Sequence, residues 1–320
     1  MAAPAKALVR IGARDLQISN VDKVLWPRDG YTKGDLIAYY RTVARWLLPH
    51  LQERPLTMQR YPDGIEGGSF FEKEAPRGTP PWVETVRVES PGGRRSHISY
   101  IVCNDEATLA FVANLGSIVL HVWTSRVGSL DNPDFALFDL DPWEGCTLRT
   151  LATVALKLRG ILGSIGLKPL VKTSGSSGLH VVIPLRREYD YEPVKIFAEL
   201  VARRLAAAAP DLTTLERMTA KRKRGSVYLD YVQVGHGKTL VPPYSVRARD
   251  GAPVSMPLDW SEVEALARKR AGEPEDASRP WTIRTAPKRL AQRGDLWAEK
   301  HWKPARLESA LVKAQRAWAE

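Results

Sequence analysis

Two aspartates at the end of an apolar run offer the clearest chemistry in this sequence. Asp139 and Asp141 end the run that begins at Phe135, and Pro142 follows directly. Because residues two apart on a strand point to the same face, both carboxylates are expected to lie side by side. Such a pair repels itself and is costly to desolvate, and a hard divalent cation relieves both costs. The pair therefore predicts metal-dependent phosphoryl transfer.

The elements around these aspartates form a recognisable order. The expected elements are a strand at 134–141, a helix at 147–162, strands at 168–174 and 179–185, a helix at 191–209 and a strand at 226–234. This β-α-β-β-α-β order is the ferredoxin-like pattern, in which the first strand lies between the third and the fourth. Asp230 on the fourth strand and His180 on the third should then lie beside Asp139 and Asp141. Three acids placed in this way could hold two divalent ions.

The first half of the chain predicts a mixed α/β module. Thr32 begins a helix with Asp35 as a capping-box variant. Further elements are expected as strands at 56–61, 70–73, 83–88, 97–102 and 120–124 and a helix at 105–114. We expect an α+β protein, one integrated domain overall, whose N-terminal module at 1–130 packs on an RRM-like catalytic module at 131–260. A helical tail at 261–320 should pack back on this body.

Composition narrows the class of protein. The chain has 320 residues, 44% of them hydrophobic, and no apolar stretch of membrane-spanning length. Met1–Lys6 lacks the core of a signal peptide, so a cytoplasmic location is expected. The net charge of +11 favours nucleic acid as a partner, although charge alone does not decide this. Basic runs in loops, at Lys221–Arg224 and Arg94–Arg95, suit phosphate contacts.

Several motifs, taken in order, resemble a known family. They are Asn20–Pro27, Arg60–Gly64, Ser69–Lys73, Phe138–Pro142, Thr173–Ser176 with Gly178–His180, and Pro243–Arg247. They are similar to the archaeo-eukaryotic primase superfamily, and most of all to the polymerase domain of bacterial ligase D, the end-joining enzyme that works with Ku. A single Asp-x-Asp is a weak signal. The ordered set, which runs over nearly the whole chain, is a strong one.

The resemblance implies roles for the nucleotide site. Asp139, Asp141 and Asp230 would be the catalytic residues that bind two divalent ions, Mn²⁺ or Mg²⁺, and one ion would clamp a nucleoside triphosphate. The implied nucleotide-binding residues are His121, Ser174, His180 and Arg247, with Phe70 and Phe71 as stacking aromatics. The chain departs from the family at Ser177, where a lysine is common. Either Lys172 or Arg249 compensates for the missing cation, or the affinity for nucleotide is lower.

The resemblance also implies DNA contacts. Asn20, Lys23 and Lys33 match a pocket for the 5′-phosphate that borders a gap. Gln59 stands where some members have a basic residue, which weakens that match. Lys221, Arg222, Lys223 and Arg224 fall where the family has a DNA-contacting loop. From the residues alone, Lys23 and Lys33 are ordinary surface lysines. Phe70 and Phe71 face opposite sides of a strand, so a core position for one of them and a site role for both are equally supported.

The function implied is a DNA-dependent polymerase that adds nucleotides, preferably ribonucleotides, to 3′ ends at gaps and breaks at the bacterial nucleoid. Ku and a separate or fused ATP-dependent ligase would be partners, and the chain itself lacks the Lys-x-Asp-Gly block of a ligase. A monomer that pairs at synapsed ends is expected. Three alternatives stay open: a primase-polymerase for excision repair or priming, a non-catalytic module that bridges DNA ends, and a two-metal nuclease.

Overall fold

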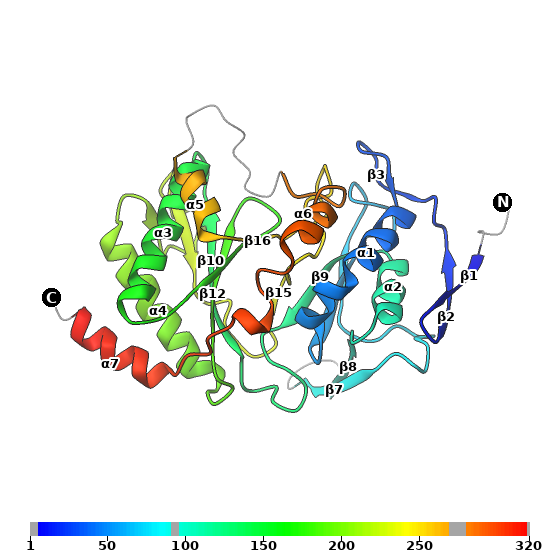
Figure 1. Ribbon diagram of the computed structural model, residues 1–320, viewed down its shortest axis with the longest axis horizontal. Helices are drawn as coiled ribbons and strands as arrows, with labels where there is room; N and C mark the ends of the chain where they lie inside the picture. Colours follow the sequence, from blue (N-terminus) through cyan, green and yellow to red (C-terminus); the bar gives the residue numbers. More distant parts are fainter. Residues whose placement is uncertain (1–5, 91–95, 269–279, 319–320) are drawn as a thin grey trace. The chain divides into compact units, whose positions relative to one another are not determined.

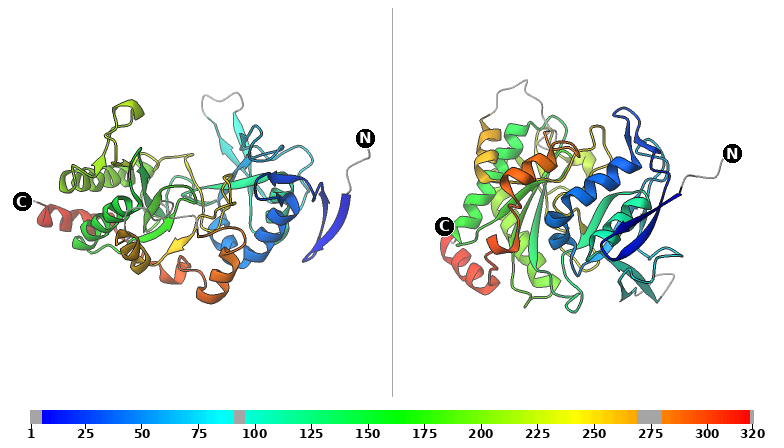
Figure 2. Two further views of the ribbon diagram at one scale, coloured as in Figure 1. Left: turned by 90° about the horizontal axis from the view of Figure 1, so that it is seen from above. Right: turned by 45° about the vertical axis from the view of Figure 1, so that its right-hand side comes forward.

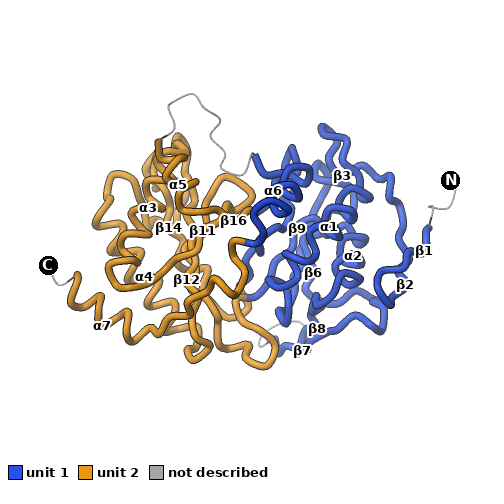
Figure 3. The backbone as a smooth tube through the Cα atoms, viewed as in Figure 1, with its two compact units in different colours: residues 1–123, 239–255, 280–295 blue, residues 124–238, 256–279, 296–320 orange. Residues whose placement is uncertain are grey.

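The computed structural model (Figure 1, with further views in Figure 2) describes residues 6–90, 96–268 and 280–318. Arg94 and Arg95 lie outside the described residues. The chain divides into two compact units, each built from separate stretches (Figure 3). Unit 1 holds residues 1–123, 239–255 and 280–295, and unit 2 holds residues 124–238, 256–279 and 296–320. These units differ from the three contiguous segments expected from the sequence because the chain crosses between the units repeatedly after residue 238.

Unit 2 is built on a six-stranded sheet with the order β13-β14-β10-β12-β11-β16. The strands are β10 (Phe135–Pro142), β11 (Leu170–Thr173), β12 (Leu179–Pro184), β13 (Thr213–Thr214), β14 (Val227–Asp230) and β16 (Pro257–Leu258). As the ferredoxin-like pattern predicts, β10 lies between β12 and β14 and is antiparallel to both. The short edge strands β13 and β16 were not predicted.

Two helices, α3 (Leu148–Ser164) and α4 (Tyr191–Ala208), pack against this sheet (Figures 1 and 2). α3 begins where the Thr147 side chain accepts a hydrogen bond from the Thr150 N–H. Its apolar side chains recur at helical spacing and are buried, with Leu151 and Leu158 among them. Leu140 is likewise buried, and its neighbours Asp139 and Asp141 point to the opposite face of the sheet. α3 and α4 therefore do not cover the face of the sheet that carries Asp139 and Asp141.

Unit 1 contains a sheet with the order β15-β9-β5-β8-β7, and β6 pairs with β5. Its strands are β5 (Pro55–Arg60), β6 (Phe70–Glu72), β7 (Thr85–Glu89), β8 (His97–Val102), β9 (Ser117–Trp123) and β15 (Thr239–Leu240). The helices α1 (Lys33–Leu51) and α2 (Glu106–Asn114) pack together, and the predicted capping box of Thr32 and Asp35 begins α1. Two hairpins were missed: β1 (Lys6–Ile11) with β2 (Arg14–Ser19), and β3 (Val24–Trp26) with β4 (Tyr31–Thr32).

The C-terminal part of the chain contributes a helix to unit 1 and two to unit 2. α6 (Ala286–Arg293) contacts α1, whereas α5 (Trp260–Ala267) and α7 (Leu307–Ala317) contact α3. Short 3₁₀ turns lie at Thr219–Lys221 and Glu299–His301. Among the described helices, none is both long and apolar enough to cross a membrane.

Candidate active site

A row of polar side chains crosses three strands of unit 2. Asp139 on β10 is the register partner of Asp230 on β14 and of His180 on β12. Cross-strand partners share one face of a sheet, with Cβ atoms about 5 Å apart, so these three side chains lie on the same face. Asp141 follows on that face, two residues along β10. The backbone thus gathers the three aspartates named from the sequence.

The carboxylate of Asp230 is held by the loop that follows it. Oδ1 accepts a hydrogen bond from the Val232 N–H at 3.1 Å, and Oδ2 accepts one from Gln233 Nε2 at 2.8 Å. This side-chain turn ends β14 at Asp230, and so the strand stops short of the expected residue 234. Gln233 could not be found from the sequence, because a glutamine that contacts an aspartate three residues away forms no recognised motif.

The donor set fits a divalent cation in its chemistry. All three acids supply carboxylate oxygens, which suit Mg²⁺ and Mn²⁺ better than softer metals. In the part of the chain that the structure describes, no three Asp, Glu, His or Cys side chains are already gathered in metal-binding geometry. Each oxygen of Asp230 accepts one hydrogen bond from the following loop, which leaves a second lone pair on each for a cation.

His180 lies between a lysine and an aspartate. Its Nδ1 is 2.9 Å from Lys172 Nζ, and its Nε2 is 3.4 Å from Asp139 Oδ1. An ammonium can only donate, so a charged Lys172 leaves the His180 proton on Nε2, facing Asp139. Lys172 has no exposed surface. It lies behind His180, and any influence on a bound nucleotide would pass through that ring.

The Gly-rich turn after β11 sits against the end of β10. Ser174 Oγ accepts hydrogen bonds from the N–H groups of Ser176 and Gly178, each at 3.1 Å. A Cβ on Gly178 would lie 2.6 Å from the Leu140 carbonyl oxygen and 3.4 Å from Asp141 Oδ1. Only glycine permits this close approach, which places the turn beside the acids.

In unit 1, His121 on β9 lies in an aromatic and basic setting. Its ring packs edge-on against Phe71, with centroids 5.3 Å apart, and its Nε2 is 3.5 Å from Gln59 Oε1. Burial, and secondarily the charge of Arg247, lowers the pKa of His121 to about 3. The imidazole is therefore neutral at physiological pH. It can donate or accept a hydrogen bond there, but it carries no charge.

The two adjacent phenylalanines are both on the surface. Phe70 is 45% exposed and Phe71 is 59% exposed, so, of the two possibilities left open by the sequence, neither ring lies in the core. The guanidinium of Arg60 lies 5.4 Å from the Phe70 ring centroid, and Arg60 also pairs with Glu72 at 2.7 Å. Two exposed aromatic rings on a short strand form a stacking surface.

The three residues expected to bind a 5′-phosphate meet beside the start of α1. Asn20 has a left-handed backbone, with φ 54°, and its carbonyl accepts from the Lys23 N–H. The Lys33 N–H donates to the Lys23 carbonyl at 2.8 Å. Lys33 is buried, and its Nζ donates to the Asn114 carbonyl at 3.0 Å. Burial and the charge of Lys23 lower the pKa of Lys33.

The remaining named residues lie in loops. In the Lys221–Arg224 run, Arg222 stacks 3.7 Å from the Tyr228 ring centroid, and Lys223 pairs with Asp211 at 3.0 Å. Arg222 is half-buried, and the other three side chains are exposed. Arg249 is exposed in unit 1, and its carbonyl accepts a hydrogen bond from Trp26 Nε1 at 3.0 Å.

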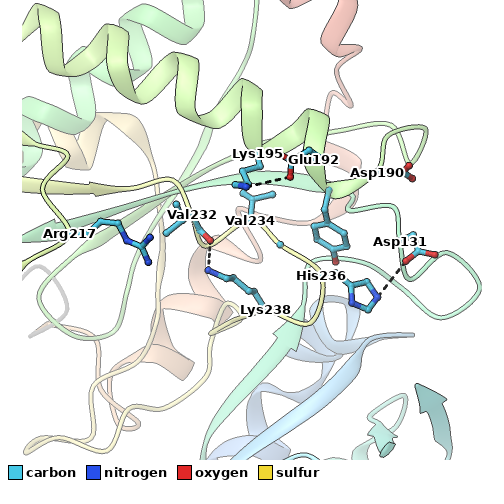
Figure 4. A pocket seen from close by; sticks show the side chains of 11 residues that line it. Asp131, Asp190, Glu192, Lys195, Arg217, Val232, Val234, His236 and Lys238 are labelled. Atoms are coloured by element: carbon cyan, nitrogen blue, oxygen red, sulfur yellow. Dashed lines mark hydrogen bonds and ion pairs between the residues drawn. The ribbon is translucent and has the colours of Figure 1, made fainter. Parts of the chain in front are cut away.

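A pocket of about 720 Å³ lies in unit 2, outside the named site residues (Figure 4). The loop that follows Asp230 forms one wall, with Val232 and His236, and the start of α4 forms another, with Lys195. His236 Nε2 is 3.4 Å from Asp131 Oδ1. The pocket is lined by cationic, acidic and apolar side chains together, so the lining does not indicate one class of ligand.

A mixed α/β protein whose ferredoxin-like sheet carries three acids on one face has the architecture of a primase-type polymerase domain. Residues 32–297 match the family described as LigD, primase-polymerase domain. The chain belongs to this family.

Curated relatives and a solved structure are similar to this chain. The multifunctional non-homologous end joining protein LigD of Mycolicibacterium smegmatis is 35% identical over 250 residues, which are 78% of this chain and 32% of the relative. The bifunctional LigD of Bacillus subtilis is 35% identical over 251 residues, which are 78% of this chain and 40% of the relative. The chain thus spans about a third of these relatives' length. The polymerase domain of Mycobacterium tuberculosis ligase D, solved in complex with DNA, matches with a TM-score of 0.80 and 33% identity, over 89% of this chain and 97% of that one.

Proposed function

We propose that this protein is a DNA-dependent polymerase of the primase type, which adds nucleotides to 3′ ends at gaps and breaks in DNA during non-homologous end joining. The observation that carries the proposal is the row of Asp230, Asp139 and His180 on one face of the unit 2 sheet. Two other findings support it: the family membership of residues 32–297 and the DNA complex of the similar ligase D domain.

Asp139, Asp141 and Asp230 would hold two divalent ions through their carboxylate oxygens. Such ions, when bound, activate a 3′-hydroxyl and neutralise charge on the leaving pyrophosphate. Asp230 would keep its hydrogen bonds from Val232 and Gln233 and offer its remaining lone pairs to the ions. His180, whose Nε2 lies 3.4 Å from Asp139 Oδ1, would help to orient that carboxylate.

Each unit carries its own candidate nucleotide-binding residues. In unit 2, Ser174 builds the tight turn and retains its own hydroxyl proton to donate to a phosphate. In unit 1, Arg247 supplies positive charge, and neutral His121 supplies a hydrogen bond. Arg249, which is exposed, and Lys172 are the two candidates for the charge that Ser177 does not supply. Phe70 and Phe71 stack on bases without regard to sequence, as a polymerase requires.

The DNA would be recognised through phosphates. Lys33, Lys23 and Asn20 lie at the positive end of the α1 dipole, which favours a terminal 5′-phosphate. The Lys221–Arg224 loop adds exposed cations for the backbone. We propose a preference for ribonucleotides and Mn²⁺, partnership with Ku and an ATP-dependent ligase, and action at the bacterial nucleoid.

Extension of a 5′-phosphorylated gapped duplex tests this proposal. The purified protein is given ribo- or deoxynucleoside triphosphates with Mn²⁺ or Mg²⁺, and matched substrates carry a 5′-hydroxyl instead. We expect templated incorporation, faster with ribonucleotides and with the 5′-phosphate. Full activity of Asp139→Ala would contradict the mechanism. Degradation of DNA without added nucleotide would favour a nuclease, and end binding without incorporation would favour a bridging module.

A further inference from the structure

The backbone of Tyr244 is in an uncommon conformation. Its φ of 68° lies in the left-handed region, which bulky side chains rarely adopt. Such a conformation persists only where the surroundings hold it, and it is often found where a functional group must be placed accurately. Tyr244 is three residues ahead of Arg247, the cation assigned to the triphosphate.

Every polar group of Tyr244 is engaged within unit 1. Its hydroxyl donates to Asp295 Oδ1 at 2.5 Å, its carbonyl accepts from the Tyr39 hydroxyl at 2.8 Å, and its N–H donates to the Ser255 carbonyl at 2.7 Å. Burial, followed by the nearby Asp295 carboxylate, raises the pKa of the Tyr244 hydroxyl, so it stays protonated and donates. Asp295 also contacts His50 Nε2 at 2.8 Å, and both side chains are buried.

The restraint continues along the chain to Arg247. Ser245 Oγ accepts from the Leu120 N–H at 3.0 Å, and the Val246 N–H donates to the Tyr40 hydroxyl at 3.1 Å. The Arg247 N–H then donates to the Pro253 carbonyl at 2.8 Å. Each residue from Tyr244 to Arg247 is thus restrained by at least one hydrogen bond to another segment of unit 1. The charge of Arg247 is also felt by His121, the other unit 1 group assigned to the nucleotide.

We propose that Tyr244 and Asp295 are positioning residues: their hydrogen bond holds the left-handed backbone at Tyr244 and so fixes the guanidinium of Arg247 for the triphosphate. This inference rests on the proposed function. It assigns a role to the buried Asp295, which the sequence motifs did not single out.

The test compares Tyr244→Phe with the wild type. The phenyl ring keeps the packing and removes only the hydroxyl. KM for the nucleotide should rise about tenfold, the scale of one lost hydrogen bond to a charged group, with kcat changed less than about twofold. Asp295→Asn keeps an oxygen acceptor and should stay near the wild-type KM, whereas Asp295→Ala should resemble Tyr244→Phe. Tyr100→Phe, at another buried tyrosine of unit 1, should leave KM unchanged.

A double variant separates positioning from general stability. If Tyr244 acts through Arg247, adding Tyr244→Phe to Arg247→Ala should raise KM no further. A folded Tyr244→Phe with wild-type KM, or a fully additive double variant, would overturn the inference.

Direct titration of a fluorescent nucleoside triphosphate in Mn²⁺ distinguishes the two proposals. If the wild type binds the nucleotide but does not incorporate it, the polymerase proposal fails, and the affinity of Tyr244→Phe still decides the inference. If the wild type does not bind it at all, both fail.

Discussion

The two groups of candidate site residues are assembled in different ways. The acids of unit 2 sit on neighbouring strands, and their alignment follows from strand register and side-chain alternation. The groups of unit 1 come from separate segments: Lys33 begins α1, His121 is on β9 and Arg247 follows β15. They are held by separate long-range contacts, such as that of Lys33 Nζ with the Asn114 carbonyl and that of the Val246 N–H with the Tyr40 hydroxyl. Substitution of the acids should therefore change the stability of the fold little and the activity strongly. For the unit 1 groups, substitution should disturb the local structure more and the activity less.

The largest effect is expected at Asp139. Asp139→Asn should lower incorporation on gapped DNA by about 10³-fold, because it removes charge where metal and phosphate charge must be balanced. Its melting temperature should not fall, since the change also relieves repulsion with Asp230. Asp131→Asn, at an exposed aspartate of unit 2, is the control and should keep its activity. A large loss of stability in Asp139→Asn would break the contrast between the two groups.

An intermediate effect is expected at Lys33. Lys33→Gln should lower activity on a 5′-phosphorylated gap about tenfold, the scale of a charged hydrogen bond, and leave activity on the 5′-hydroxyl substrate nearly unchanged. Arg28→Gln, at an exposed salt bridge of the same unit, should change neither rate. Equal losses on both substrates would mean that Lys33 acts on structure and not on the phosphate.

Substitution of glycines tests how closely the Gly-rich turn approaches the backbone of β10. Gly178→Ala places a Cβ against the Leu140 carbonyl, so it should cost about 1–3 kcal/mol of stability and also lower activity. Gly160→Ala, in the middle of α3 with open space around it, should instead stabilise by up to about 1 kcal/mol. Chemical denaturation of both variants gives the comparison. A neutral Gly178→Ala would show that the turn does not approach the acids closely.

The smallest effect is a pH dependence in unit 1. The folded pKa of His121, about 3, lies below its ordinary value, so the unfolded state takes up the proton first. Stability from this group is complete above about pH 6.5 and is lost as the pH falls toward 3. When the pH falls from 7 to 5, the free energy of unfolding should fall in the wild type more than in His121→Gln. The difference between the two losses should be on the order of 1 kcal/mol. Urea unfolding at both pH values measures this, with His301→Gln as the exposed control. Equal losses in both proteins would contradict the assigned environment.

The same contrast explains what the sequence could predict. Alternation and helical spacing predicted β10, α3, β12 and α4, and with them the alignment of Asp139 with Asp230 and His180. The end of β14 was missed because the Asp230 carboxylate bonds its own following loop, which no periodicity records. Gln233 and Asp295 were missed for a related reason. Their roles depend on a few specific contacts, and Asp295 and Tyr244 are 51 residues apart in sequence. Phe70 and Phe71 are both exposed because β6 pairs only with β5, off the main path of the sheet. The alternation of residues along β6 does not reveal this.

Manganese binding measured by electron paramagnetic resonance tests the central claim most directly. The wild type, titrated with Mn²⁺ in the presence of a nucleoside triphosphate, should bind two ions. Asp139→Asn and Asp230→Asn should each lose at least one of them, while Asp131→Asn should bind as the wild type does. Unchanged Mn²⁺ binding in Asp139→Asn and Asp230→Asn would contradict the assignment of this acid row as the metal site.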